Sequence, residues 1–102
     1  MEVIILKEVK DFVTELGEDT MSRVQRFTDM LTRFGYRLRM PYSKNILPGI
    51  FELRIGGIHN IRLMYTFSND TAIVFYGFEK KTEQISLQEM NTIKMKFNRL
   101  QI

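Results

Sequence analysis

Two arginines lie inside short stretches whose residues alternate between apolar and polar. Arg54 belongs to the polar set of residues 50–55 together with Glu52, and Arg62 belongs to the polar set of residues 59–67. Successive side chains of a β-strand point to opposite faces of the sheet, so Glu52, Arg54 and Arg62 share a face if the two stretches are neighbouring strands. Because a guanidinium group donates a planar fork of hydrogen bonds that matches a phosphate, this face is a candidate anion-binding site.

Aromatic and cationic residues of a third stretch extend this face. If the hairpin after residue 67 is tight, Tyr76 lies opposite Arg62, and Lys80 and Lys81 leave from the end of the same strand. Aromatic rings stack on unpaired bases and cations bind phosphates, so the combination favours RNA. Two plainer interpretations stay open: an exposed antiparallel face is normally polar, and Glu52 can form a simple cross-strand ion pair with Arg62.

RNA cleavage is a reaction that these residue types can perform. The 2′-hydroxyl of RNA is itself a nucleophile, so an enzyme must deprotonate it, stabilise the phosphorane and protonate the leaving 5′-oxygen. Arg54 and Arg62 are the candidates for charge stabilisation, and Glu52 is a candidate for orienting them. His59 is a candidate base or acid, and Lys80 is a candidate base if nearby cations lower its pKa from about 10.4. For His59 beside a glycine turn the alternative is a solvated side chain, and for Lys80 it is a phosphate-binding or solvated one.

The composition argues against several other chemistries. The chain has 102 residues, no cysteine and a single histidine. Disulfides and thiolate zinc sites are therefore excluded, and a His-based metal site or an acyl-transfer triad is not expected. We expect neither a metal nor a cofactor. The sequence also lacks an apolar run of about 20 residues and a signal-peptide pattern, so we expect a cytoplasmic protein without a membrane partner.

Positive charge is concentrated in the middle of the chain. The formal net charge is +3, and residues 36–66 hold five cations against the single carboxylate of Glu52. Three of these cations, Arg37, Arg39 and Lys44, precede the first long strand, and we predict that they bind RNA. A solvated surface is the alternative interpretation of such a charged segment.

The spacing of apolar residues predicts one α+β domain, residues 1–102, with a helical hairpin, a small antiparallel sheet and a final helix. The first helix covers residues 9–16, the second is capped by Asp19 or Thr20 and ends at Gly35, and a capping box at Ser86 and Glu89 begins the third. Residues 2–6 fit either a further strand or the start of the first helix, and residues 36–48 are irregular. The predicted strands are 50–55, 59–67 and 71–78, with their apolar sets facing the helices.

Three motifs follow one another between residues 47 and 82. They are Leu47–Arg54 (LPGIFELR), Ile61–Tyr65 (IRLMY) and Tyr76–Thr82 (YGFEKKT). In this order they resemble the RelE/HigB-type toxins of bacterial type II toxin–antitoxin systems, most closely the phage-associated HigB-like branch. The resemblance extends over residues 20–100 and implies a RelE-like fold.

The resemblance also implies a function. Such toxins cleave messenger RNA, usually in the ribosomal A site, and a cognate antitoxin, often a helix-turn-helix protein, keeps them inactive. Arg54 and Arg62 match the sheet arginines that bind the scissile phosphate in the family, and Lys80 with Lys81 matches its lysine pair. The related ParE-type toxins share the fold but inhibit DNA gyrase without cleaving RNA, so the fold alone leaves this alternative open.

Overall fold

The computed structural model describes residues 1–100 and forms an α+β structure with three α-helices, a short 3-10 helix and a five-stranded sheet. The elements in chain order are β1 (Glu2–Ile5), α1 (Lys7–Thr14), α2 (Glu18–Phe34), the 3-10 helix η1 (Gly35–Arg37), β2 (Ser43–Leu47), β3 (Ile50–Ile55), β4 (Ile61–Ser68), β5 (Thr71–Glu79) and α3 (Leu87–Arg99). The predicted helical hairpin, three-strand meander and final helix are all confirmed.

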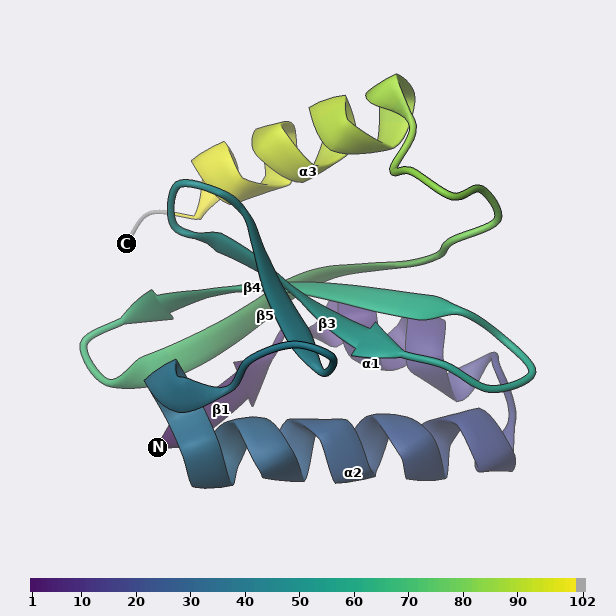
Figure 1. Ribbon diagram of the computed structural model, residues 1–102, viewed down its shortest axis with the longest axis horizontal. Helices are drawn as coiled ribbons and strands as arrows, with labels where there is room; N and C mark the ends of the chain where they lie inside the picture. The colour runs from purple at the N-terminus through teal and green to yellow at the C-terminus, as the bar shows by residue number, and fades with distance from the viewer. Residues whose placement is uncertain (101–102) are drawn as a thin grey trace.

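The strands form one mixed sheet in the order β1-β5-β4-β3-β2. Strands β2 to β5 pair antiparallel, whereas β1 runs parallel to β5. The segment that the sequence left undecided between strand and helix is therefore a strand, and it makes the sheet mixed instead of purely antiparallel. Figure 1 shows α1 and α2 on one side of the sheet and α3 on the other.

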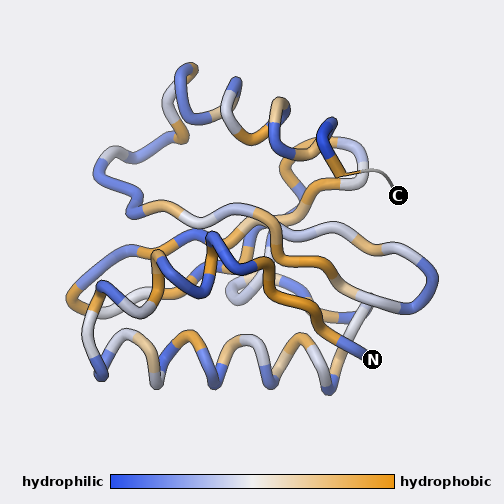
Figure 2. The backbone as a smooth tube through the Cα atoms, turned by 180° about the vertical axis from the view of Figure 1, so that it is seen from behind, coloured by the Kyte–Doolittle hydropathy of each residue, from blue (hydrophilic) through white to orange (hydrophobic). Residues whose placement is uncertain are grey.

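The sheet face toward α1 and α2 carries the larger core, as predicted. Seen from behind, the central strands are largely hydrophobic, while α2 alternates between hydrophobic and hydrophilic residues along its turns (Figure 2). Gly77 of β5 allows close contact with α1, because a Cβ atom there would lie 2.8 Å from a Leu63 methyl and 2.9 Å from the Phe12 ring. Buried members of this core are Val9, Val13, Val24, Leu31, Leu53, Ile55, Ile61, Leu63 and Tyr65.

A bulge in β5 changes which side chains reach the other face. Met64 pairs with Tyr76 but Tyr65 pairs with Val74, so Phe75 is an additional residue in β5. Such an insertion shifts the alternation of the following side chains by one residue. It brings Phe75, Tyr76 and Phe78 to the same face as Met64.

Helix α3 covers much of this second face, so the expectation of an open sheet face is wrong. Ile93 is fully buried there against Met64, Phe75 and Phe78, with Phe97 packed at the edge. The physical reason is the aromatic surface that the bulge creates, since burying apolar area stabilises by about 25 cal/mol per Å². An open pocket lies at the end of this face near Arg62.

Two local expectations also need correction. Residues 43–47 form the edge strand β2 in a segment predicted to be irregular, with the Asn45 side chain donating to the carbonyls of Leu47 and Ile50 at 2.8 and 3.0 Å. The N-cap of α2 is Gly17, with no side-chain cap bond, instead of Asp19 or Thr20.

Helix α1 covers residues 7–14 instead of the predicted 9–16, whereas α2 is capped at its end by Gly35 as predicted. The predicted cap of α3 is confirmed, because the Glu89 N–H donates to Ser86 Oγ at 3.1 Å. Within residues 1–100, every helix is too short or too polar to cross a membrane.

Candidate functional site

Glu52 lies between Arg54 and Arg62 on the sheet face that α3 partly covers. Its Oε1 is 3.5 Å from Arg54 Nε, and its Oε2 is 3.8 Å from Arg62 Nε. Arg54 pairs with Arg62 across β3 and β4, whereas Glu52 pairs with Met64, so the Glu52–Arg62 contact is diagonal. The structure thus brings together the three residues that alternation placed on one face, and we call them the arginine–glutamate cluster.

Glu52 and Arg62 of this cluster are buried, and their hydrogen bonding is incomplete. Glu52 is 3% exposed and Arg62 is 8% exposed. Arg62 Nη1 donates to the Ile61 carbonyl at 3.1 Å, yet among the described residues neither Arg62 Nε nor Glu52 Oε2 has a hydrogen-bond partner. Burial lowers the pKa of Arg62, and the Glu52 charge opposes that shift. The two buried atoms, Arg62 Nε and Glu52 Oε2, face each other at 3.8 Å, so they form an ion pair without a direct hydrogen bond.

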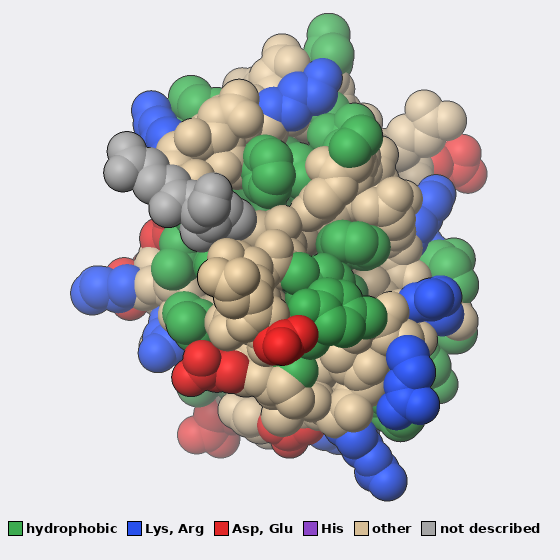
Figure 3. Space-filling view, turned by 90° about the vertical axis from the view of Figure 1, so that its left-hand side faces the viewer, with side chains coloured by type: hydrophobic (Ala, Val, Ile, Leu, Met, Phe, Trp, Pro, Cys, Tyr) green, Lys and Arg blue, Asp and Glu red, His purple; other side chains and the backbone are tan. Residues whose placement is uncertain are grey.

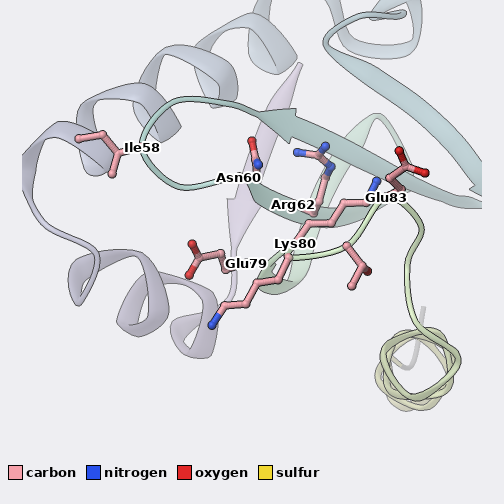
Figure 4. A pocket seen from close by; sticks show the side chains of 8 residues that line it. Ile58, Asn60, Arg62, Glu79, Lys80 and Glu83 are labelled. Carbon is pink, nitrogen blue, oxygen red and sulfur yellow. The ribbon is translucent and has the colours of Figure 1, made fainter.

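An open pocket of about 670 Å³ adjoins the cluster at Arg62. Figure 4 shows Arg62 and Asn60 on one side, Glu79 and Lys80 at the end of β5, Glu83 beyond them, and Ile58 at the outer end. The Lys80 N–H donates to the Asn60 carbonyl at 2.7 Å, which continues the strand pairing past the end of β5. This pairing fixes the point from which Lys80 and Lys81 leave the sheet, and both line the pocket.

His59 is on the loop of residues 56–60 between β3 and β4, and it is not one of the residues that line the pocket. Its Nδ1 is 3.0 Å from Glu79 Oε2, and the two side chains are 34% and 32% exposed. Glu79 lines the pocket, and this contact joins the His59 side chain to Glu79. If Nδ1 carries the hydrogen and donates it to Glu79, Nε2 is left as the accepting nitrogen.

Tyr76 contacts α3 and not Arg62. Tyr76 pairs with Met64 and Phe78 pairs with Arg62, so that prediction of register is wrong. The turn of two residues, 69–70, and the bulge at Phe75 each shift the register by one residue. The Tyr76 hydroxyl donates to Glu89, and Lys96 lies 5.4 Å from the ring centroid. Burial, followed by the hydrogen bond to Glu89, raises the pKa of Tyr76.

The remaining predicted RNA-binding cations lie elsewhere on the surface. Arg37 and Arg39 line a separate pocket of about 340 Å³, together with the half-exposed Met40 and Tyr42. Lys44 is exposed on the edge strand, paired in register with Glu52. Figure 3 shows one end of the molecule, where Lys and Arg side chains gather along one side and hydrophobic side chains near the centre. The structure therefore distributes the predicted cations over more than one surface.

Several pocket residues were not predicted from the sequence. Ile58, Asn60, Glu79, Thr82 and Glu83 all line the pocket with Arg62 and the two lysines. The only available indication was positional, because Glu79 directly precedes the lysine pair and Ile58 directly follows the glycine turn. Neither residue type by itself points to nucleic acid.

Comparison with known proteins identifies one family. Residues 11–98 match the family described as Phage derived protein Gp49-like (DUF891). A search of curated proteins found no match to the chain.

Proposed function

Because this chain belongs to the Gp49-like family, a RelE-like toxin family of toxin–antitoxin systems, we propose that it is a HigB-like toxin that cleaves messenger RNA on the ribosome without a metal ion. In this proposal the 2′-hydroxyl attacks the adjacent phosphate. The protein acts in the cytoplasm and is inhibited by a cognate antitoxin, for which a helix-turn-helix protein is the proposed type.

One observation supports the proposal: Arg62, paired with the buried Glu52, lines the same pocket as Lys80 and Lys81. Two carboxylates, Glu79 and Glu83, also line this pocket, so its cations exceed its carboxylates by one. Charged donors held in place before the reaction stabilise developing charge most effectively. Arg62 is held by strand β4 and by its contact with Glu52, so its position is set before RNA binds.

The proposed roles follow the positions of the side chains. Arg62 stabilises the phosphorane, Arg54 supports it through Glu52, and Lys81 binds a neighbouring phosphate. Lys80 is the proposed acid for the leaving 5′-oxygen. His59 is the proposed base, with Glu79 on Nδ1 fixing the tautomer that leaves Nε2 to accept the proton.

Arg37, Arg39 and Lys44 have a proposed role away from the scissile phosphate. They lie outside the pocket that Arg62 lines, so they are proposed to bind the backbone of messenger or ribosomal RNA. Tyr76 would stack on a base only after its hydroxyl leaves Glu89.

The test must separate catalysis from folding, because removing Arg62 alone leaves Glu52 buried with Arg54 as its remaining cation. Losing a buried pair costs about 3 kcal/mol or more, which could unfold so small a protein. The double variant Arg62→Ala/Glu52→Gln removes both charges and should remain folded by thermal melting. It should cleave mRNA on translating ribosomes about 10²–10³ times more slowly than the parent.

Two further variants complete this experiment. Arg62→Lys keeps the charge without the planar fork, so it should recover only part of the rate. Arg99→Ala removes an exposed cation at the end of α3 and should cleave at the parental rate. A folded double variant that cleaves as fast as the parent would contradict the proposal, and growth arrest with broken DNA but intact mRNA would favour a gyrase inhibitor.

A further inference from the structure

Ile58 is an exposed apolar side chain at the tip of the loop between β3 and β4. It is 85% exposed, more than any other large hydrophobic residue in residues 1–100. Gly57 beside it has φ +127°, and a Cβ atom there would lie 2.8 Å from Arg23 Nε. The loop backbone therefore lies directly against the Arg23 side chain of α2, which supports the loop with Ile58 pointing outward.

This isoleucine separates two cationic pockets. On one side it lines the pocket that contains Arg62, Lys80 and Lys81. On the other side it lines a second pocket of about 230 Å³ that contains Arg23 and Arg26. The two hydroxyl residues Thr20 and Ser22 and one carboxylate, Asp19, complete the second pocket.

An apolar surface between two groups of cations matches the chemistry of a single RNA strand. A strand presents phosphates at regular intervals and a base between them. Proteins bind it with a positive groove and with aromatic side chains that stack on the bases, and other apolar side chains also pack against an unpaired base. In Figure 4, Ile58 lies on the loop at one end of the pocket, away from Arg62. A strand that places one phosphate at Arg62 would leave this pocket across Ile58.

We propose that the second pocket is a binding site for an RNA phosphate and that Ile58 supports the base between this phosphate and the one at Arg62. Arg23 and Arg26 bind the second phosphate, so the strand crosses the β3–β4 loop. This inference rests on the proposed RNA cleavage. It gives a phosphate-binding role to Arg23 and Arg26 of α2, which the proposed chemistry does not use.

The first experiment measures cleavage of mRNA on programmed ribosomes by Ile58→Ser. We expect KM to rise about fivefold or more while kcat changes little, because a base support contributes mainly to binding. The matched control is Leu87→Ser, which removes a second strongly exposed aliphatic side chain, 79% exposed at the start of α3. This control should keep the parental KM.

The second experiment measures the salt dependence of binding to a single-stranded RNA oligonucleotide. The variant Arg23→Gln/Arg26→Gln should reduce the slope of log K against log salt by about 0.7 for each phosphate that the arginines no longer neutralise. Arg33→Gln changes an exposed arginine in the last turn of the same helix and should leave the slope unchanged.

The outcomes separate this inference from the proposed function. If the parent cleaves RNA but Ile58→Ser and the double arginine variant both behave like their controls, the second site is wrong and the cleavage proposal stands. If Ile58→Ser instead weakens binding of the cognate antitoxin with KM unchanged, the loop is a protein-binding surface and the inference is overturned. If the parent does not cleave RNA at all, the proposed function itself fails.

Discussion

Arg62 differs from the solvated arginine that a polar sheet face usually carries. It is nearly buried, its guanidinium lies near a buried carboxylate, and burial lowers its pKa. Such an arrangement is costly in folding free energy, because two charges leave water and two of their polar atoms lack partners among residues 1–100. Such a cost in folding free energy is expected for a residue that has to stay charged and in a fixed position. The sequence predicted the grouping with Glu52 but not the burial of the two side chains.

Tyr76 provides a test at the residue scale through pH. The folded-state pKa of Tyr76 is raised by burial and by Glu89, above the unfolded value of about 10. The folded protein therefore binds more protons than the unfolded chain above that pH, so this contribution to stability is present below pH 10 and is lost as pH rises beyond it. Tyr76→Phe should be less stable than the parent at pH 7, by about 1 kcal/mol.

Thermal melts between pH 8 and pH 12, a range set by the tyrosine reference pKa of about 10, supply the measurement. The melting temperature of Tyr76→Phe should fall less steeply than that of the parent above pH 10. Tyr36→Phe is the comparison, because Tyr36 donates to Asp70 at 3.0 Å on the exposed surface, where such a bond contributes less. If the melting temperatures of the parent and of Tyr76→Phe fall equally steeply with pH, the proposed contribution of the neutral Tyr76 hydroxyl to stability is contradicted.

At the scale of elements, the β5 bulge decides what the site looks like. The alternation in 50–55 and 59–67 correctly predicted which side chains of β3 and β4 face α1 and α2. It could not predict an additional residue at Phe75, because a bulge leaves no pattern in a stretch where consecutive residues are apolar. From this one residue follow the aromatic second face and its cover by α3. The register of Tyr76 differs for two reasons, because the turn before β5 is also one residue shorter than predicted.

Gly77 tests the packing of α1 on β5. A Cβ atom there would meet the Leu63 methyl at 2.8 Å and the Phe12 ring at 2.9 Å, so Gly77→Ala should force the helix away from the sheet. Overpacking of this kind costs about 1–3 kcal/mol. Gly56→Ala is the matched control, since a Cβ atom at Gly56 has no described atom within 4 Å. Urea unfolding midpoints of the two variants should differ, and equal midpoints would show that α1 adjusts without strain.

At the scale of the whole molecule, charge and topology act together. The sequence indicated that cations are concentrated in residues 36–66. The fold divides these cations between the pocket at Arg62 and the surface around Arg37 and Arg39, and it adds Lys80 and Lys81 from β5. Pocket residues such as Ile58 and Glu79 could not be predicted, because they meet only through the pairing of distant strands and the position of one loop.

The central claim is that RNA is cut by its own 2′-hydroxyl, and the chemical nature of the new ends tests this most directly. The protein is incubated with programmed ribosomes, and the RNA fragments are then treated with polynucleotide kinase without prior phosphatase. Attack by the 2′-hydroxyl leaves a 5′-hydroxyl, which the kinase labels at once, and a 2′,3′-cyclic phosphate on the other fragment. Fragments that carry 5′-phosphates and free 3′-hydroxyls, and so resist labelling, would contradict the account.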